Sequence, residues 1–571
     1  MKLRGIEIRN FRSILFEQIH VKDCALLVGA NNSGKSSVID AIRAFYENDG
    51  FKFDRKDDFP HSKAESEEAQ EAWIELEFEL TDDEFVSLAE DYKSTNKRLT
   101  VRKYFLTNKK TTDGKPAVGY IFAYNSKGEL TDSPFYGAKN VQSGKFGKLI
   151  YIPAISKVDE HAKLSGPSDL RDLLTDVVTL AVEQGSAFEN FASNLEAFSN
   201  AIRREETADG RSLASFEAEL NSLLEPWNSN FSLKFPAPTP SDIVKSMVSW
   251  EVVDQLHGKP QSISSYGSGF QRHFIYSLIS MGSKYGGRRS TKKSKDFVPS
   301  LTLLLFEEPE AFLHPPQQEL LAQSLRTLSE TTDWQVLCTT HSSLFVSKNA
   351  NDIPSIIRMQ REGDGSSAYQ VSDEEWAEIV DANMAINSIA EKYPKFGKRL
   401  HELDAKPEME AVKHLLWLNN DRSSLFFSNH VLLVEGPTEV ALVKRLLDHG
   451  KLSGLPNGFF VIDTIGKYNV HRFMALLSAF GIRHSVLYDG DNEVEYNAEV
   501  NQLINDSRSC FTTEIASLAS DLERFFEIPS GGAPHRKPQH VLYLYETGQI
   551  AQSKIDAFCE ILRQSCLKAS R

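Results

Sequence analysis

Two glutamates four residues apart, Glu435 and Glu439, follow a short apolar run in the segment VLLVEGPTEVALV (431–443). A later apolar run ends in Asp489 and Asp491. Carboxylates that converge on one place repel one another, so they stay ionised together only beside cations. Hard divalent ions that take oxygen ligands, Mg²⁺ or Mn²⁺, suit such a group of acids. The pattern therefore predicts a divalent-metal site.

The elements that would hold these acids alternate between strand and helix after residue 425. The segments HVLLVEGPTEVALVKRLLDHG and GFFVIDTIGKYNVHRFMALLSAFG each read as strand, turn and helix, and IRHSVLYDGDN is a third strand. This order predicts a small parallel α/β domain with ligands outside the carboxyl ends of its strands. Glu439 falls in the first turn of a helix, where the dipole favours a carboxylate. Asp489 and Asp491 are expected in an extended segment, with their carboxylates on the same side.

The strongest pattern lies near the start of the chain, in CALLVGANNSGKSSVIDAIRAF (24–45). An apolar strand (24–28) runs through G-x-x-x-x-G-K-S into a helix, which is the context that a phosphate-binding loop requires. Backbone N–H groups and the helix N-terminus would surround the phosphates of ATP. Lys35 would reach the β- and γ-phosphates, and Ser36 would bind Mg²⁺. The predicted nucleotide-binding residues of this segment are Gly29, Asn32, Gly34, Lys35, Ser36 and Ser37.

Two later apolar strands end in polar groups that suit the same site. LTLLLFEEPEAFLHP (301–315) contains Glu307, which would hold the Mg²⁺ shell, and Glu308, which would polarise the attacking water. WQVLCTTHSSLF (334–345) contains His341, which could touch the γ-phosphate. Together with the phosphate-binding loop, these strand ends predict an ATPase.

These pieces, in this order, resemble the ABC-type ATPases of the SMC/RecF/OLD group. The resemblance implies that Glu308 is the catalytic base and His341 the switch histidine. Ser268 and Gly269 match the start of the S-G-G-Q signature loop, and Phe270 replaces its second glycine. Sites of this group form between two protomers, so the resemblance implies a homodimer or a higher even homo-oligomer. In that assembly Ser268 of one protomer would face the phosphate-binding loop of the other.

A glutamate after one strand and a D-x-D pair after another resemble the Toprim domain. A topoisomerase would need a tyrosine-bearing cleavage domain and a bacterial-type primase a zinc module, and neither is expected in this chain. Glu439 fits the nuclease version of Toprim, as do Asp521 and Glu523 in SDLERFFEI (520–528), which could complete a second metal site. The nucleases carry a catalytic lysine near a helix start, where this chain has Lys537. Two other basic residues, Arg536 and Lys554, remain alternatives for that role.

An ABC-type ATPase followed by a Toprim nuclease is the layout of the OLD (overcoming lysogenisation defect) family, which the chain resembles over nearly its whole length. The resemblance implies an ATP-regulated, divalent-metal-dependent DNA endonuclease that acts in anti-phage defence. Its implied metal ligands are Ser36 and Glu307 beside ATP, and Glu435, Glu439, Asp489, Asp491, Asp521 and Glu523 beside DNA. Family members act alone, beside a helicase, or with a reverse transcriptase and its nucleic acid, and the sequence does not choose among these.

Two other functions stay open at this point. The first is a RecF-like DNA-repair ATPase whose Toprim domain docks a partner without catalysis. Convergent acids and Lys537 argue against it, because a docking module needs none of them. The second is a transporter ATPase subunit, which the C-terminal α/β domain and the imperfect signature loop disfavour.

Composition is that of an ordinary globular protein with several domains: 571 residues, 41% of them hydrophobic and 25% charged, and a net charge of −15. The five cysteines form no CxxC pair, which favours a reducing cytoplasm over a disulfide framework or a zinc site. Apolar runs are too short to span a bilayer, and the N-terminus lacks a signal-peptide core. We therefore expect a cytoplasmic protein that does not enter the membrane.

The expected fold is α/β and multidomain. Its predicted parts are an N-terminal ATPase lobe (1–160), a helical insert (161–250), a C-terminal ATPase lobe (251–372), a helical linker (373–425) and a Toprim domain (426–571). The insert is either a dimerisation element or a helical cover. Segments 71–80 and 100–108 should pair as antiparallel strands with one solvent-exposed face. A buried strand at 148–156 should close this lobe. Helical stretches of the joint at 393–427 would transmit rigid-body shifts from the ATPase to the nuclease.

Overall fold

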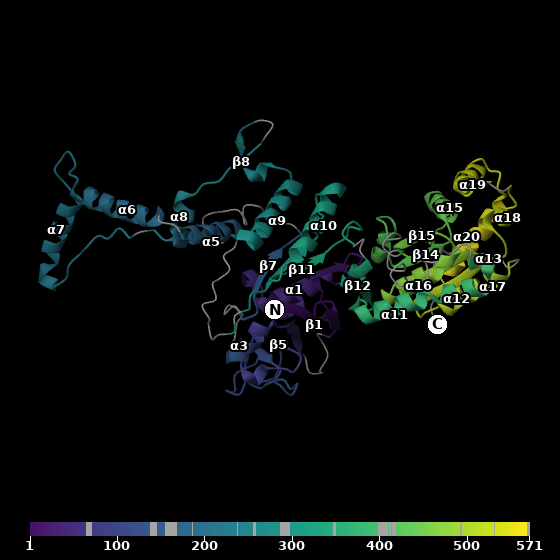
Figure 1. Ribbon diagram of the computed structural model, residues 1–571, viewed down its shortest axis with the longest axis horizontal. Coiled ribbons are helices and arrows are strands. Elements are labelled where there is room, and N and C mark those ends of the chain that lie inside the picture. Colours follow the sequence, from purple (N-terminus) through teal and green to yellow (C-terminus); the bar gives the residue numbers. More distant parts are fainter. Residues whose placement is uncertain are drawn as a thin grey trace. The chain divides into compact units, whose positions relative to one another are not determined.

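The computed structural model of the protein describes residues 1–63, 71–137, 145–154, 168–184, 187–236, 238–254, 258–285, 297, 299–346, 350–397, 409, 413, 418–491, 494–529 and 532–567. The chain divides into two compact units, coloured along the sequence in Figure 1. The first unit joins Met1–Ala154 to Lys295–Arg571, and the second is Ile155–Ser294. Within the described part of the chain, no helix combines the length and the apolar character that a membrane span requires.

A six-stranded sheet carries the ends of the ATPase motifs, and its strands come from both sequence segments of the first unit. Its strands are β3 (Cys24–Val28), β7 (Lys148–Ile152), β10 (Thr302–Glu307), β11 (Trp334–Thr339), β12 (Ile356–Glu362) and β13 (Gly365–Tyr369), in the order β13-β12-β3-β11-β10-β7. All are parallel except β13, which pairs antiparallel with β12. The buried aliphatic runs of β3, β10 and β11 fit a parallel sheet that is covered on both faces.

The buried strand predicted at 148–156 is present as β7, which ends earlier, at Ile152, and is an edge strand of the six-stranded sheet. Its backbone pairs with β10, with Ile150 opposite Leu304. This pairing brings Tyr151 to the acidic end of β10. The antiparallel sheet therefore closes without β7, and its edge is the short strand β6 (Ile121–Ala123).

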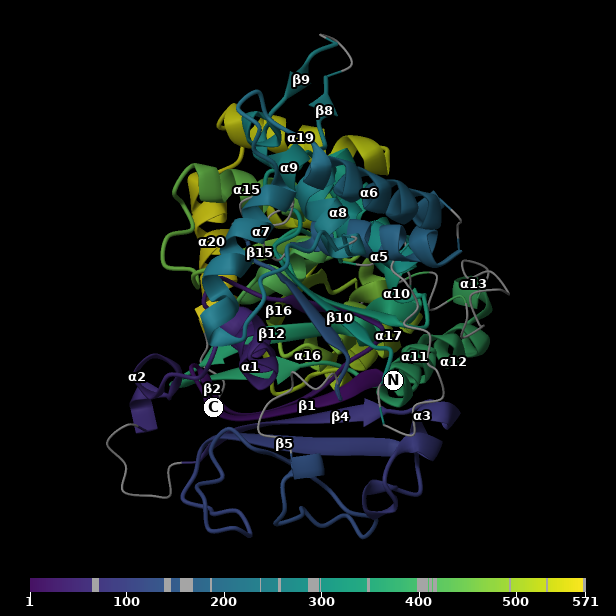
Figure 2. The same ribbon diagram turned by 90° about the vertical axis from the view of Figure 1, so that its left-hand side faces the viewer.

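The antiparallel sheet of the first unit has the strand order β2-β1-β4-β5-β6. Its other strands are β1 (Lys2–Phe11), β2 (Ile14–His20), β4 (Ala72–Glu79) and β5 (Arg98–Leu106), and β1, β4 and β5 run side by side in Figure 2. The predicted pairing of β4 with β5 is confirmed. The face expected to be wet is partly covered, because Trp73, Tyr104 and Phe122 form a buried cluster there. The guanidinium of Arg102 lies 3.8 Å from the centre of the Trp73 ring and pairs with Glu75 at 2.7 Å.

Helix α1 (Lys35–Tyr46) contributes to one hydrophobic core together with strands of both sheets. Its residues Val38, Ile39 and Ile42 are fully buried. The helix ends against the buried Lys103 of β5, whose Nζ donates to the carbonyl oxygen of Phe45 at 2.8 Å. A cation at a helix C-terminus is favoured by the dipole.

Three further helices of the N-terminal and central segments are α2 (Arg55–Asp58), α3 (Asp82–Ser87) and α10 (Pro315–Ser329).

The second unit is mostly helical, in agreement with the pattern of 168–227. It contains α5 (Asp169–Gln184), α6 (Ala187–Arg204), α7 (Leu213–Leu224), α8 (Pro240–Met247) and α9 (Ser268–Tyr285), with the two-residue strands β8 (Val252–Val253) and β9 (Pro260–Gln261). Leu170 and Leu278 form a small buried cluster of this unit. Large apolar side chains of α6, α7 and the turn after α7 stay exposed, with Leu223 at 73% and Trp227 at 78%. A dimerisation role for this unit stays a prediction.

The C-terminal part of the first unit contains the predicted parallel α/β domain. Its four parallel strands, in the order β15-β14-β16-β17, are β14 (His430–Val434), β15 (Phe459–Asp463), β16 (Arg483–Asp489) and β17 (Thr512–Leu518). Its helices are α15 (Pro437–Asp448), α16 (Val470–Ala479), α17 (Glu495–Asp506), α18 (Leu522–Phe525), α19 (Lys537–Glu546) and α20 (Gln552–Leu567). Aliphatic residues of β14, β16, α15 and α20 share one buried core. We refer to this part as the C-terminal domain.

Helices α11 (Asp373–Asn383), α12 (Ala385–Lys392) and α13 (Pro394–Gly397) of the predicted linker pack on the C-terminal domain. The Tyr393 hydroxyl donates to Glu499 of α17 at 2.9 Å, and the Phe396 ring stacks on Tyr496 at 5.1 Å between centroids. Most of the predicted joint at 393–427 lies outside the described residues, namely 398–408, 410–412 and 414–417.

A buried arginine joins the six-stranded sheet to the C-terminal domain. Arg358 of β12 is 2% exposed. Its guanidinium donates to four backbone carbonyl oxygens, those of Phe426 at 3.2 Å, Ser428 at 2.9 Å, Phe480 at 3.0 Å and Gly481 at 3.3 Å. Burial lowers the pKa of Arg358 to about 10, so the group is still a cation at neutral pH. The fixed fork of donors on an arginine suits such a set of divergent acceptors.

Candidate functional site

The phosphate-binding loop lies between β3 and α1, and neither of its end glycines has room for a side chain. Gly29 has a φ of +135° and Gly34 a φ of +105°. A Cβ on Gly29 would lie 2.2 Å from the carbonyl oxygen of Met359, and a Cβ on Gly34 would lie 2.7 Å from Cβ of Ser366. Both neighbours belong to β12 and β13. The loop is therefore shaped by this hairpin as well as by its own sequence.

Lys35 points back over the loop that precedes it. Its Nζ donates to the carbonyl oxygens of Gly29 and Ala30, each at 2.9 Å. Burial lowers the pKa of Lys35 to about 8, against the attraction of acids at the end of β10. Phosphate oxygens are stronger acceptors for an ammonium group than two neutral carbonyls. Ser36 is exposed at the start of α1, and Ser37 is buried beneath it.

The acids predicted at the end of β10 reach the edge that the loop occupies, because β3, β11 and β10 are parallel neighbours. Glu307 accepts from the hydroxyl of Tyr151 at 2.9 Å. Glu308 has a left-handed backbone with φ +44°, and its Oε1 lies 3.6 Å from Nε2 of His341. Burial and the nearby Lys35 lower the pKa of His341, which keeps the ring neutral at ordinary pH.

Glu310 is a site residue that the sequence reasoning missed. Its carboxylate accepts from the backbone N–H of His341 at 2.6 Å, so it fixes the turn that carries the histidine. Burial raises the pKa of Glu310, and Glu308 raises it further. The available signal was its place in E-E-P-E, three residues after the end of the strand.

The predicted signature residues lie in the second unit. Ser268 and Gly269 are the first residues of α9, and Ser268 and Phe270 are exposed. The predicted helix start is confirmed. A role for Ser268 in the site of another protomer stays a prediction.

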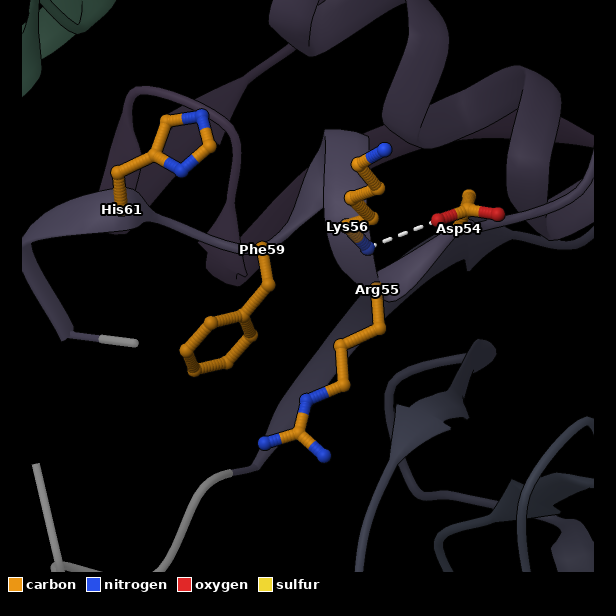
Figure 3. Close-up of a pocket in the computed structure, with 5 residues that line it drawn as sticks. All are labelled: Asp54, Arg55, Lys56, Phe59 and His61. Atoms are coloured by element: carbon orange, nitrogen blue, oxygen red, sulfur yellow. Dashed lines mark hydrogen bonds between the residues drawn. The ribbon is translucent and has the colours of Figure 1, made fainter. Parts of the chain in front are cut away.

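A shallow surface pocket of the N-terminal segment lies on α2 and the residues that follow it (Figure 3). Asp54, Arg55, Lys56, Phe59 and His61 line it. The Asp54 side chain caps α2 by accepting from the N–H of Lys56 at 2.8 Å. None of the predicted site residues lines this pocket, and we assign it no role.

The acids of the C-terminal domain lie where neighbouring parallel strands end. Glu435 directly follows β14, and its Oε1 accepts from the backbone N–H of Asp489, the last residue of β16, at 2.8 Å. Glu439, in the first turn of α15, accepts from the N–H of Gly436 at 3.1 Å. The strand order therefore brings together acids that are more than fifty residues apart in the chain.

The chain turns sharply after β16, which corrects the expectation of an extended Asp489–Asp491 segment. Asp491 has a φ of +43°, so the two carboxylates do not follow the alternation of a strand. Aspartate tolerates this left-handed conformation better than most residues. Two side-chain donors of helix α17 hold the turn. Nδ2 of Asn501 donates to the carbonyl oxygen of Gly490 at 2.9 Å, and Nδ2 of Asn497 donates to the carbonyl oxygen of Asp491 at 3.3 Å.

Lys467 is the second residue that the sequence reasoning missed. It is 4% exposed, and its Nζ donates to the carbonyl oxygens of Asp489 at 2.5 Å and Gly490 at 3.1 Å. Burial lowers its pKa, and the charges of Glu435, Asp491 and Asp489 oppose that shift. The signal was a lysine just after the strand FFVID, at the edge where the acidic strands also end.

Burial in a shared negative field raises the proton affinity of the C-terminal acids. The pKa of Asp489 is raised to about 8, mainly by burial and then by Glu435 and Glu439. Burial also raises the pKa of Glu435 to about 7 and that of Glu439 to about 6. Ionising all of them together is unfavourable, and a bound cation would relieve this cost.

The remaining predicted residues of this domain lie around α18 and α19. Glu523 is buried and pairs with Nζ of Lys537 at 3.0 Å. Burial disfavours the charged form of Lys537, but Glu523, Asp521 and Asp489 outweigh it and raise its pKa. Lys554 pairs instead with Glu527, at 2.9 Å. The side chain of Asp521 caps α18, and Arg536 is exposed before α19, which begins at Lys537 itself.

The donor chemistry of this cluster fits a hard divalent cation, because every candidate ligand is a carboxylate. Among the residues that the structure describes, no three His, Cys, Asp or Glu side chains already stand as ligands of one ion. A cation would have to draw the side chains together.

Two known families match segments of this chain. Residues 24–347, more than half of the chain, match the family described as "AAA domain, putative AbiEii toxin, Type IV TA system". Residues 426–491 match "Overcoming lysogenization defect protein-like, TOPRIM domain". The chain belongs to this AAA family and to the OLD group of ATPase–Toprim proteins. We therefore call its C-terminal domain the Toprim domain.

Similar proteins cover most of this OLD-family chain. The Old nuclease of Escherichia phage P2 is 26% identical over 506 residues, which are 86% of this chain and 77% of that protein. Endonuclease GajA of Bacillus cereus strain VD045 is 23% identical over 514 residues, 86% of this chain and 75% of that protein. Among solved structures, the SMC head domain from Thermotoga maritima is 16% identical with a TM-score of 0.30, covering 65% of this chain and all of that one.

The raised pKa values predict how the stability of the metal-free OLD-family protein depends on pH. The pKa of Asp489 rises from 3.8 to about 8 on folding, and that of Glu435 rises from 4.5 to about 7. Protonated carboxyls therefore stabilise the fold at low pH, and this contribution is lost progressively as the pH rises from about 4, where the unfolded carboxyls ionise, to about 8. In a chelator, these two groups should lower the melting temperature as the pH rises from about 5 to about 8. Asp489→Asn should make that fall smaller.

The matched control is Asp448→Asn, because Asp448 is 68% exposed at the end of α15. It should keep the wild-type slope. Equal slopes for wild type and Asp489→Asn would contradict the raised pKa of the buried carboxyl.

Proposed function

We propose that this protein is an ATP-regulated, divalent-metal-dependent DNA endonuclease. The observation that carries the proposal is the convergence of Glu435, Asp489 and Glu439 at the ends of parallel elements, with proton affinities that a cation would offset. Its similarity to proteins named Old nuclease and Endonuclease GajA, over most of their lengths, supports the same activity.

For the nuclease, Glu435, Asp489 and Asp491 would hold one cation, and Glu439, Asp521 and Glu523 a second. Divalent cations there would supply an activated water and neutralise the leaving 3′ oxygen. Lys467, Asn497 and Asn501 position the turn that carries two of the acids. Lys537 would offset the charge that develops on the phosphate. Its pairing with Glu523 favours it for this role over Lys554, which pairs with Glu527.

For the ATPase, Lys35 would exchange two loop carbonyls for phosphate oxygens, and Ser36 with Glu307 would hold Mg²⁺. Glu308 would polarise the attacking water, next to a neutral His341 that Glu310 holds in place. ATP would act as a regulator of cleavage. Its site would be completed by Ser268 and Gly269 of a second protomer in an even homo-oligomer.

Anti-phage defence is the proposed biological role. The protein would act alone, beside a helicase, or with a reverse transcriptase, as its family resemblance implies. Its substrate would be DNA.

The nuclease proposal predicts cleavage of supercoiled plasmid in Mg²⁺ or Mn²⁺. Glu435→Ala should reduce the rate at least ~10²-fold, because loss of a direct ligand should cost at least as much as loss of an outer-shell partner. ATP hydrolysis should persist in this variant, since the ATPase residues are untouched. Glu560→Ala is the control, because Glu560 is 57% exposed on α20. Undiminished cleavage by Glu435→Ala would contradict the assignment of the nuclease site to these acids. A wild type that is inert with every metal and partner would favour the RecF-like docking alternative.

The ATPase proposal predicts that Glu308→Gln binds ATP but hydrolyses it at least ~10²-fold more slowly, as when a positioned base is lost. Lys35→Ala should weaken nucleotide binding itself. Glu330→Gln, at an exposed position after α10, should behave as wild type. Binding is measured by calorimetry and turnover by phosphate release. Wild-type turnover in Glu308→Gln would show that another residue activates the water.

A further inference from the structure

The hairpin of β12 and β13 is tied to the start of the phosphate-binding loop. In the register of β12 with β3, Arg358 lies opposite Val28, the residue before the first loop glycine. Ser366 of β13 donates through Oγ to Oγ of Ser13 at 2.8 Å, and Ser13 Oγ lies 3.3 Å from Oγ of Ser37 in α1. Both loop glycines pack on this hairpin at distances that exclude a Cβ. A shift of the phosphate-binding loop would therefore displace the hairpin as well.

The same hairpin also contacts the amino ends of two Toprim strands. Arg358 donates to carbonyl oxygens in the short segments that precede β14 and β16. Tyr369 of β13 packs on Gly481, where a Cβ would lie 2.5 Å from its ring. The ring of Tyr369 also meets Phe511, before β17, edge-on at 5.6 Å between centroids.

The two Toprim strands that Arg358 holds are the ones that end in the site acids. β14 has five residues and leads to Glu435, and β16 has seven and ends in Asp489. Hydrogen bonds along the whole of β14 join these strands to each other. A displacement of their amino ends would therefore reach the acids, because a paired strand moves as one body.

The contact at Arg358 resists separation. Pulling the hairpin away would break the hydrogen bonds of the guanidinium to four carbonyl oxygens and leave it only Gln360 of its own strand as a partner, and each such loss is unfavourable. The β12–β13 hairpin and the amino ends of β14 and β16 are therefore expected to move as one unit. This is the property required of an element that transmits a change between two sites.

We propose that the β12–β13 hairpin, through Arg358, transmits nucleotide occupancy of the phosphate-binding loop to the Toprim acids. The proposal concerns the regulation of the proposed nuclease and rests on that proposed function. It assigns the coupling to this hairpin instead of the joint at 393–427.

The test compares the full-length wild type with Arg358→Lys, which keeps the charge but loses the fork of donors. Arg361→Lys is the matched control, because Arg361 is exposed on the same strand and donates to the carbonyl oxygen of Asp364. Hydrogen exchange of residues 426–436 and 480–491 is measured without nucleotide and with a non-hydrolysable ATP analogue. Plasmid cleavage is measured under the same two conditions.

In wild type and Arg361→Lys, the analogue should change exchange in both segments and alter cleavage by ~5-fold or more, the lower end of usual couplings. In Arg358→Lys both responses should vanish, while nucleotide binding and nucleotide-free cleavage persist. If that variant fails to fold, Tyr369→Ala, which removes the ring on Gly481, replaces it and should lose the same responses.

A wild-type response in a folded Arg358→Lys or Tyr369→Ala protein would overturn the proposal. Absence of any nucleotide response in the wild type would overturn it too, while leaving the nuclease and ATPase activities standing. Loss of those activities in the wild type would instead contradict the proposed function, and the exchange measurement would still decide whether the hairpin couples the two sites.

Discussion

The guanidinium of Arg358 sits where water does not reach, on acceptors that are all neutral. A buried cation is costly unless its donors are satisfied, and here the backbone before β14 and before β16, together with the side-chain oxygen of Gln360, satisfies them. The two strands must therefore start at fixed distances from β12. Because β12 also pairs with β3, the phosphate-binding loop and the Toprim sheet are built on one shared support.

Electrostatic repulsion is the second constraint, and it acts at both acidic sites. In the Toprim domain, burial of Glu435 and Asp489 raises their pKa, and the ammonium of Lys467 lies against the turn between Asp489 and Asp491. In the ATPase, the buried Lys35 lies near Glu308 and Glu310. Each site thus holds a lysine of its own among carboxylates, which partly balances their charge before any ligand binds.

Much of the architecture was predictable from local patterns. Apolar runs ending in Gly29, Glu307, Glu435 and Asp489 identified the strands that carry the sites, because buried parallel strands read as continuous apolar segments. Rules for parallel sheets then placed their ends at one edge. Glu310 and Lys467 were missed because their roles depend on backbone groups that are distant in the sequence. The sharp turn at Asp491 was missed because its left-handed backbone depends on donors from α17 and the segment after β15.

The sequence by itself determined the ATPase and Toprim motifs, the order in which their strands follow one another along the chain, and the identity of the acids. These features depend on residue type and local periodicity. Tertiary structure alone decided which strand pairs with which, as β7 shows by joining β10, and which lysine stands beside which acid. It also decided that one buried arginine connects the strand beside β3 to the segments that precede β14 and β16. The physical reason is that burial, and the hydrogen bonds it makes obligatory, come from residues far apart in the chain, and no local pattern encodes their meeting.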